Sequence, residues 1–297
     1  MIKIKIPATS ANIGSGFDSL GVALNMYNYV NMKEHDFVEI RSLDGVSVPT
    51  DTNNLIYKTV KYMFDLCGKP LNGLYIEQVS RIPLARGLGS SSACIAAGVM
   101  GANALMGFPL SKDELINAAA KLEGHPDNST PAIAGGLVTA VIDNDKVYYV
   151  KQPLRDDLTF AAIIPDFELK TSKARSVIPK EISHKNGVFN LSRAALMSVS
   201  LYSGNYQNLR VACDDRLHQP YRLPLIKGAN EVFNGVYQLG AYGAYISGAG
   251  STLMAIVDKN NAQFAQDCRA MLDSLGHNGW ALEMLSIDNE GAQLVCE

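Results

Sequence analysis

Pro83-Leu-Ala-Arg-Gly-Leu-Gly-Ser-Ser-Ser-Ala93 is the stretch on which we base the fold of this chain. A strand-like run at 74–82 precedes it, and an uncharged, alanine-rich run at 94–106 follows it as a predicted buried helix. A glycine-rich turn between a strand and a helix presents free N–H groups and the positive end of the helix dipole to an anion. The serine hydroxyls and the charge of Arg86 add groups that bind phosphate or Mg²⁺. The stretch therefore predicts a phosphate-binding loop.

This loop differs from two common nucleotide-binding patterns. The sequence contains no GxxxxGK[S/T], which argues against a P-loop. A serine stands where GxGxxG would need its third glycine, after Gly87 and Gly89. Taken alone, the loop could also be a glycine–serine turn that only caps a core helix. Other segments of the chain help to distinguish a phosphate-binding loop from a simple helix-capping turn.

The overall composition favours a globular protein with a small-molecule ligand. Of the 297 residues, 47% are hydrophobic and 19% are charged, a length and balance that suit one large domain or two halves. A net charge of −3 without a Lys/Arg block argues against a nucleic-acid partner. The 5 cysteines show no CxxC spacing, and the N-terminus has no signal-peptide core. We expect free thiols, a cytoplasmic location and no membrane segment.

A polar segment near the N-terminus is the second unusual feature. Apolar residues alternate with lysines over residues 2–6, as in a strand with one solvated face, and residues 22–32 again resemble a strand. Between them lies a glycine-punctuated loop, residues 7–21, with short polar side chains that can hold a polar ligand: Thr9, Ser10, Asn12, Ser15, Asp18 and Ser19. The alternative is a loop whose polar side chains only satisfy their own backbone.

A third feature is the segment Glu123-Gly-His-Pro-Asp-Asn128. A capping box from Ser111 to Glu114 opens a predicted helix, and this segment follows directly beyond the end of that helix. A carboxylate here can complete a Mg²⁺ site begun by a serine of the phosphate loop. For Glu123 alone the alternative is a solvated carboxylate, and for His125 it is a turn histidine.

The remaining elements come in mixed order and predict an α+β fold in two halves, with boundaries at 1–155 and 156–297. Strands are expected at 37–42, 136–142, 146–150, 160–164, 280–286 and 292–296, and helices at 54–66 (capped by Asp51 or Thr52), 189–203, 206–214, 223–238 and 261–275. A second glycine-rich loop, Ser247-Gly-Ala-Gly-Ser-Thr252, lies between two short apolar strands. Arg175 and Arg222 can grip a carboxylate, although a surface ion pair is the simpler interpretation of each.

Together these segments resemble a known family. PATSANIGSGFDSLGVAL, IPLARGLGSSSA and SGAGST are similar to the three signature motifs of the GHMP small-molecule kinases, and they occur in the family's order. EGHPDN and HQPYR narrow the resemblance to the homoserine kinase branch. One departure is visible, because Ser251 stands where proline is common in the third motif.

The resemblance implies an N-terminal half like domain 2 of ribosomal protein S5 and a ferredoxin-like C-terminal half. It implies ATP and Mg²⁺ as cofactors, with Ser91 and Glu123 as metal ligands. It also implies L-homoserine as the substrate, bound by Asn12, Asp18, His125, Thr171, Arg175, Arg222 and Gly248. The ATP phosphates are expected on the loop formed by Pro83, Leu84, Ala85, Arg86, Gly87, Leu88, Gly89, Ser90, Ser91, Ser92 and Ala93. A second copy of the chain, in a homodimer, is a candidate partner.

The implied reaction is phosphoryl transfer from ATP to the side-chain hydroxyl of L-homoserine, a step in threonine biosynthesis. Related kinases carry a catalytic aspartate where this sequence has Asn128, so we expect in-line attack without a strong base. Asn128 would orient the hydroxyl, with Glu123 and Arg175 completing the catalytic set. Two alternatives remain open: a family member acting on another small alcohol such as mevalonate, and a non-catalytic ligand-binding member.

Overall fold

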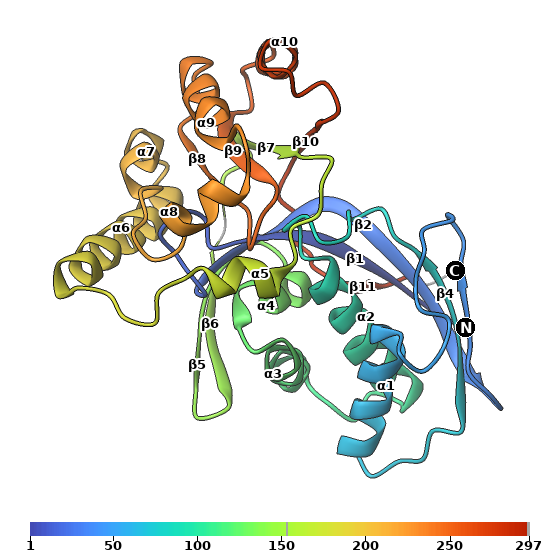
Figure 1. Cartoon of the computed structure of the whole chain (residues 1–297). Helices are drawn as coiled ribbons and strands as arrows, with labels where there is room; N and C mark the ends of the chain where they lie inside the picture. The colour runs from blue at the N-terminus through green and yellow to red at the C-terminus, as the bar shows by residue number, and fades with distance from the viewer. Residues whose placement is uncertain (153, 296–297) are drawn as a thin grey trace.

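The computed structural model describes residues 1–152 and 154–295, which form an α+β fold with two sheets (Figure 1). The larger sheet contains β1 (Ile2–Ala11), β2 (Leu20–His35), β3 (Glu39–Ser42), β4 (Gly73–Val79), β5 (Leu137–Asp143), β6 (Lys146–Gln152) and β11 (Gln293–Leu294). Its main order is β11-β1-β2-β4-β3, and β5 pairs with the start of β2 and with β6. The smaller sheet has the order β10-β7-β9-β8, from β7 (Leu158–Ile164), β8 (Gly243–Ile246), β9 (Leu253–Asp258) and β10 (Ala281–Leu285).

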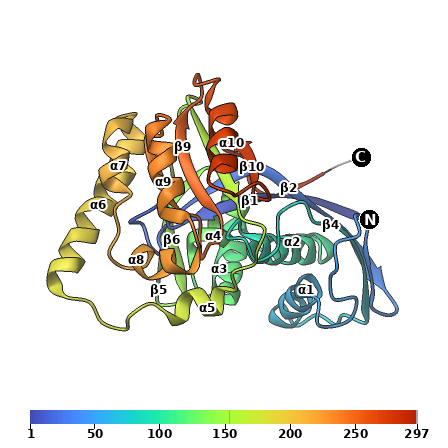
Figure 2. The ribbon, with the colours of Figure 1, turned by 45° about the horizontal axis from the view of Figure 1, so that its top comes forward.

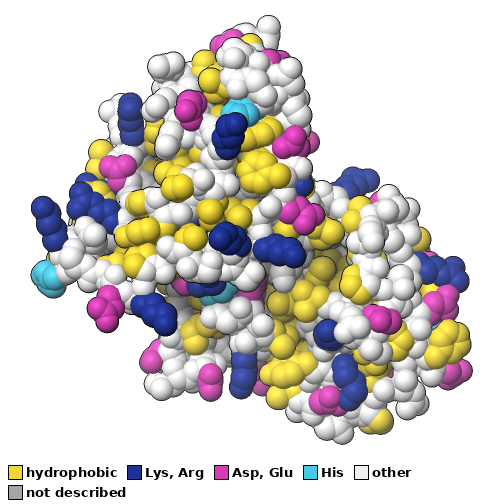
Figure 3. All heavy atoms as spheres, in the orientation of Figure 1, with side chains coloured by type: hydrophobic (Ala, Val, Ile, Leu, Met, Phe, Trp, Pro, Cys, Tyr) yellow, Lys and Arg dark blue, Asp and Glu magenta, His cyan; other side chains and the backbone are white. Residues whose placement is uncertain are grey.

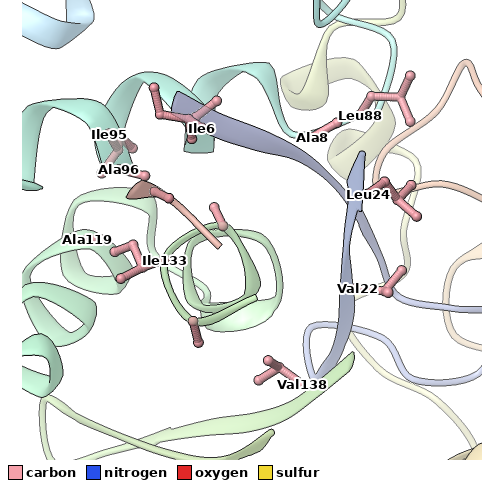
Figure 4. Close-up of a cluster of buried hydrophobic side chains, with 14 of the residues drawn as sticks. Ile6, Ala8, Val22, Leu24, Leu88, Ile95, Ala96, Ala119, Ile133 and Val138 are labelled. Atoms are coloured by element: carbon pink, nitrogen blue, oxygen red, sulfur yellow. The ribbon is translucent and has the colours of Figure 1, made fainter. Parts of the chain in front are cut away.

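The first half packs its helices against the larger sheet. These are α1 (Leu55–Leu66), α2 (Ser90–Leu105), α3 (Lys112–Glu123) and α4 (Pro126–Ala134), and they lie together beside the long strands (Figure 1). Figure 4 shows Ile6 of β1, Ile95 of α2 and Ile133 of α4 meeting in this core. Small residues let α2 approach its neighbours closely. A Cβ on Gly101 would lie 2.3 Å from the sulfur of Met32, so a larger residue here would force the Met32 side chain to move.

The second half combines the smaller sheet with helices of 4 to 20 residues (Figure 2). They are α5 (Thr171–Ser176), α6 (His184–Ser203), α7 (Leu209–Ala212), α8 (Gln219–Arg222), α9 (Ala229–Gln238) and α10 (Phe264–Ser274), with 3₁₀ turns η1 (Tyr206–Asn208) and η2 (Leu223–Leu225). None of the helices within 1–152 and 154–295 has the length and apolar character needed to cross a membrane.

The two halves are not separate hydrophobic units. The core of the first half continues into the second through Phe160, Tyr245 and Met254, and β11 returns to pair with β1. A division of the chain at 155/156 stays a prediction. The strand expected at 292–296 is present only as β11, and residue 296, with the thiol of Cys296, falls outside the described residues.

Three local predictions are wrong, each for a physical reason. Part of the expected loop at 7–21 is strand, because small side chains let β1 continue through a bulge to Ala11 and pair with β2. Asn54, rather than Asp51 or Thr52, caps α1: its Oδ1 accepts from the N–H of Ile56 at 2.9 Å. The predicted helix at 223–238 begins only at Ala229, since the chain first makes the tighter turn η2.

Helix α4 was not predicted at all. Its prolines and the glycines that follow it read as a loop in sequence, yet Pro126 occupies the first helical position, where its missing N–H costs nothing. Pro131 sits inside the helix and offers no N–H to the carbonyl of Asp127. Burial on nearly every side stabilises the helix despite this, and it carries the EGHPDN side chains into the molecule.

Candidate active site

A cavity of about 330 Å³ lies between the two halves and is lined by the three motif loops. In the space-filling view a hollow separates the upper and lower lobes, and charged and histidine side chains are visible inside it (Figure 3). The cavity brings together residues that lie far apart in sequence: Asn12, Asp18, Glu123, His125, Asn128, Thr171, Arg175, Arg222 and Gly248. All of them were expected site residues.

The phosphate loop ends in the first turn of α2. The helix begins at Ser90, with Gly89 as its N-cap at a φ of 71°, and no side chain caps it. The first-turn N–H groups of Ser90, Ser91 and Ser92 therefore have no intrahelical partner, and these residues line the cavity. A Cβ on Gly89 would lie 1.9 Å from Thr9 Oγ1, so both backbone conformation and space require glycine here.

Arg86 does not direct its donors into the cavity as expected. Its Nε donates to the carbonyl of Pro165 at 3.0 Å, and its terminal nitrogens donate to the carbonyls of Leu84 and Asp166 at 3.2 and 3.1 Å. The guanidinium thus fastens the phosphate loop to the second half. Arg86 lines the cavity, but these hydrogen bonds to backbone carbonyls use three of the five N–H donors of its guanidinium.

The glycine-rich loop 247–252 closes against the phosphate loop. Ser247 Oγ donates to the carbonyl of Gly87 at 2.6 Å, and the N–H of Thr252 donates to the carbonyl of Arg86 at 3.0 Å. A Cβ on Gly87 would lie 2.2 Å from the Ser247 carbonyl oxygen. Ser251, at the position that departs from the family pattern, donates its hydroxyl to the carbonyl of Phe167 at 2.9 Å.

Glu123 faces the start of α2 from the end of α3. Ser92 Oγ–H donates to Glu123 Oε1, while Oε2 is buried and has no hydrogen-bond partner. Burial raises the pKa of this carboxyl to about 7, although His125 and the Ser92 hydrogen bond oppose that shift. A buried carboxylate oxygen without a partner, beside exposed Ser91 and a helix N-terminus, fits a divalent cation held together with phosphate.

The polar side chains of EGHPDN support one another on α4. His125 Nδ1 lies 2.7 Å from Asp127 Oδ1, and the amide of Asn128 donates to the same oxygen at 3.4 Å. Thr9 Oγ1 donates to Asn128 Oδ1 at 2.8 Å, so the amide is held from both sides. Burial opposes protonation of His125, but the hydrogen bond and charge of Asp127 outweigh it and raise the histidine pKa.

The loop after β1 and helix α5 form the opposite wall. Arg175 makes a two-pronged ion pair with Asp18, at 2.9 and 3.3 Å. Asn12, at a φ of 72°, donates to the carbonyl of Gly248 at 2.7 Å and accepts from the N–H of Asp18 at 3.0 Å. Arg175 is exposed and does form an ion pair, as the simpler interpretation expected, but this pair joins the two halves at the cavity.

Arg222 is buried rather than exposed, which excludes a surface ion pair for this residue, in contrast to Arg175. Its Nη1 donates to the carbonyl of Gly248 at 2.9 Å and lies 3.2 Å from His218 Nδ1. Burial, together with the charge of Arg175, lowers its pKa to about 10, which leaves it protonated at neutral pH. A buried cation at the cavity wall is suited to an anionic ligand group.

Four polar side chains proposed for ligand binding instead bond to the protein. Thr9 contacts Asn128; Ser10 lies within hydrogen-bond distance of Tyr245 and Ser247; Ser15 and Ser19 donate to backbone carbonyls. Within the phosphate loop, four residues do not line the cavity: Pro83, Leu84, Leu88 and Ala93. The cavity also includes residues not predicted from sequence: Leu55, Ile95, Leu122, Asp127 and Ala249. The first three give it an apolar part that no sequence motif announces.

The sequence is similar to known kinases over most of its length. The family model described as "GHMP kinases N terminal domain" matches residues 54–136. The model described as "GHMP kinases C terminal" matches residues 197–270. A homoserine kinase of Clostridium beijerinckii is 46% identical over 297 residues, covering 99% of each chain.

The chain belongs to the homoserine kinase family of the GHMP kinases.

Solved structures of this family agree with the fold. The homoserine kinase from Cytophaga hutchinsonii superposes on this structure with a TM-score of 0.87 at 28% sequence identity. The superposition covers 99% of the present chain and 97% of the Cytophaga chain. The two-half GHMP kinase fold expected from the motifs is confirmed. A mevalonate kinase matches with a TM-score of 0.70 at 16% identity, covering 98% of this chain and 100% of that one, which is a likeness of fold alone.

Proposed function

We propose that the chain transfers the γ-phosphoryl group of ATP to the side-chain hydroxyl of L-homoserine. The observation that carries this proposal is the union, in one cavity, of a free helix N-terminus and a set of paired charges suited to a zwitterion. The N-terminus of α2 suits the phosphates. The apolar part of the cavity, near Leu55 and Ile95, leaves room for the base of the nucleotide.

The opposite wall has the charges that an amino acid requires. Homoserine carries an ammonium and a carboxylate, so Asp18 would meet the first while Arg175 and Arg222 meet the second. Asp18 and Arg175 pair with each other at 2.9 Å. The ammonium and carboxylate of the ligand would join this pair, so that four charges of alternating sign lie together. Asn12, Thr171 and Gly248 lie beside these charges and would fix the backbone of the substrate.

Glu123 and Ser91 are the groups we assign to Mg²⁺. The partnerless Oε2 of Glu123 supports this assignment, and the ion would supply neutralisation of phosphate charge. Ser92 occupies the other carboxylate oxygen and so aims Glu123. In this arrangement the protein needs Glu123 ionised in the presence of the ion, in spite of the raised pKa in its absence.

The transfer step needs little covalent chemistry from the protein. Asn128 cannot accept a proton as a base, and its amide is fixed between Thr9 and Asp127. We assign it the orientation of the attacking hydroxyl. Asp127 is buried, and its Oδ1 is already shared by His125 and Asn128, which disfavours it as a base. Positioning and charge neutralisation would supply most of the rate.

An ADP-release assay tests this function. L-homoserine, L-threonine, L-serine, mevalonate and no acceptor are compared at equal concentration. Stimulation by L-homoserine above all the others is the expected result. Mevalonate lacks an ammonium, so in the alternative function Asp18 would have no ligand cation to bind and would keep only Arg175 as its ion-pair partner. Stimulation by mevalonate alone would preserve the kinase chemistry and overturn the acceptor site.

We further propose a homodimer in the cytoplasm. An apolar surface is exposed on α6 and the β5–β6 hairpin, made up of Val141, Tyr148, Val150, Val188, Leu191, Val199 and Tyr202. Helix and hairpin adjoin, since Thr139 Oγ1 and Ser198 Oγ lie 3.3 Å apart. In a two-fold symmetric dimer, the apolar surfaces of two copies would pack against each other and be removed from water. The described cysteines are all free thiols, which suits a reducing compartment.

A further inference from the structure

His218 lies directly behind the cavity wall, at the start of the HQPYR segment. It is fully buried and does not line the cavity. Its ring stacks on Phe17 with the centroids 5.0 Å apart. Its Nδ1 lies 3.2 Å from Arg222 Nη1, and its Nε2 lies 2.8 Å from the carbonyl oxygen of Gly14. One imidazole therefore contacts both Arg222 and the loop that carries Asn12 and Asp18.

The chemistry of these partners fixes the tautomer of the ring. A guanidinium only donates hydrogen bonds, so His218 Nδ1 must accept one from Arg222 and carries no proton. A carbonyl only accepts, so the proton resides on Nε2 and is donated to Gly14. His218 is thus a neutral imidazole whose two nitrogens have opposite roles.

The surrounding charges are consistent with a neutral ring. Burial is the main cause that lowers the pKa of His218, and the cation of Arg222 acts in the same direction. Asp215 and Asp18 oppose this shift. The carboxylate of Asp215 lies 3.6 Å from Nε2, but it already accepts the N–H groups of Leu217, His218 and Gln219 at 2.6 to 2.9 Å.

Without this acceptor, few contacts would hold Arg222. Nη1 would keep the carbonyl of Gly248 at 2.9 Å, and Nε has only a long contact of 3.4 Å to the carbonyl of Ala174. The guanidinium also lies 5.3 Å from the centre of the Phe17 ring, and Arg175 lies 5.9 Å from the same ring. The charge of Arg175 already opposes that of Arg222, so a protonated His218 would add a further repulsion, whereas a neutral ring offers Arg222 an acceptor.

We propose that His218 is a positioning residue that aims Arg222 at the carboxylate of the amino-acid substrate through its Nδ1 acceptor. This inference rests on the proposed function, in which Arg222 binds that carboxylate. Because His218 touches neither substrate nor nucleotide, its effect reaches the reaction only through Arg222. The ATP side of the cavity does not depend on it.

A matched pair of substitutions separates the two nitrogens. The oxygen of asparagine can replace Nδ1, so His218→Asn keeps an acceptor for Arg222 and loses the donor to Gly14. The amide nitrogen of glutamine can replace Nε2, so His218→Gln keeps the Gly14 contact and loses the acceptor. We expect His218→Gln to raise the KM for L-homoserine roughly tenfold or more, the size of one lost charge-assisted hydrogen bond. We expect His218→Asn to raise it less than about threefold, with the KM for ATP unchanged in both.

Thermal unfolding of both variants measures the structural contribution of the ring separately. Equal rises in the homoserine KM for the two variants, or a fall in Tm with no change in KM, would overturn the positioning role. Arg222→Lys alone tests the underlying function, because it should raise the homoserine KM whatever His218 does. Adding His218→Gln to Arg222→Lys should then raise KM little further. A fully additive double variant would show that His218 acts independently of Arg222.

Discussion

At the scale of single residues, the adjacent Asn128 and Asp127 are expected to differ in how strongly their substitution lowers kcat. Both line the cavity, but Asn128 is fixed by Thr9, whereas Asp127 is buried and its Oδ1 is shared by His125 and Asn128. We expect Asn128→Ala to lower kcat about 100-fold through lost orientation of the hydroxyl. Asp127→Asn should lower kcat less than about tenfold, since an amide can still accept from His125. Steady-state kinetics check both, and a loss of several orders of magnitude for Asp127→Asn in a folded protein would refute attack without a base.

Glu123 predicts a pH dependence of stability in the metal-free protein. Its pKa is raised to about 7 mainly by burial, so the folded state binds this proton more tightly than the unfolded state does. The resulting stabilisation is complete below the ordinary carboxyl pKa and is lost as the pH rises through about 7. In EDTA, the Tm of Glu123→Gln should therefore exceed that of the wild type by more at about pH 8.5 than at about pH 5.5. With Mg²⁺ and ATP present, the variant should be less active than the wild type.

Adding Mg²⁺ with ATP provides the control for this prediction. The ligands should stabilise the wild type at the higher pH more than they stabilise Glu123→Gln, because the substituted amide is a poorer metal ligand. A Tm gain that does not change with pH would show that the charge of Glu123 is not the source of the effect.

At the scale of elements, the N-terminus of α2 depends on glycine at its cap. Gly89→Ala would place a Cβ 1.9 Å from Thr9 Oγ1 and would impose a positive φ of 71° on alanine. Since Thr9 also holds Asn128, we expect this variant to raise the KM for ATP and to lower kcat/KM by about 100-fold or more.

Gly107→Ala is the matched control for backbone strain. Gly107 also has a positive φ, of 82°, but a Cβ there meets nothing within 4 Å. It should lose stability by about 1 kcal/mol and keep normal kinetics. Equal kinetic losses in both glycine variants would contradict a specific role for the α2 N-terminus.

The element scale also shows what sequence could predict. The strand–loop–helix around residues 83–93 and the hairpin β5–β6 follow from local patterns. Helix α4 does not, because its proline-containing sequence becomes helical only through burial against β1, β2 and β5. The site residues came from motif resemblance. The bonds from Arg86 to Pro165 and from His218 to Gly14 could not be predicted, since these partners lie 79 and 204 residues away in the chain.

At the scale of the whole molecule, the apolar surface on α6 and the β5–β6 hairpin predicts self-association. Leu191→Glu places a charge in this surface without touching the cavity. Light scattering after size exclusion should give a dimer for the wild type and a monomer for the variant. Gln266→Glu, at an exposed position of α10 outside this surface, is the control and should stay dimeric. A monomeric wild type would contradict the proposed interface.

The whole molecule also explains why the substrate site needs both halves. Asp18 belongs to the first half, and Arg175 and Arg222 belong to the second, so the proposed recognition of a zwitterion would depend on their junction. A substrate without the carboxylate would leave the buried Arg222 without an anion, and one without the ammonium would leave Asp18 with Arg175 as its only ion-pair partner, both of which are unfavourable.

The most direct measurement is therefore kcat/KM for three alcohols that differ in one charge: L-homoserine, 4-hydroxybutanoate without the ammonium, and 3-aminopropanol without the carboxylate. The structure predicts that each missing charge lowers kcat/KM by at least about 1000-fold, and that Asp18→Asn narrows the gap between L-homoserine and 4-hydroxybutanoate. If 4-hydroxybutanoate or 3-aminopropanol is phosphorylated as efficiently as L-homoserine, the assignment of Asp18, Arg175 and Arg222 is wrong.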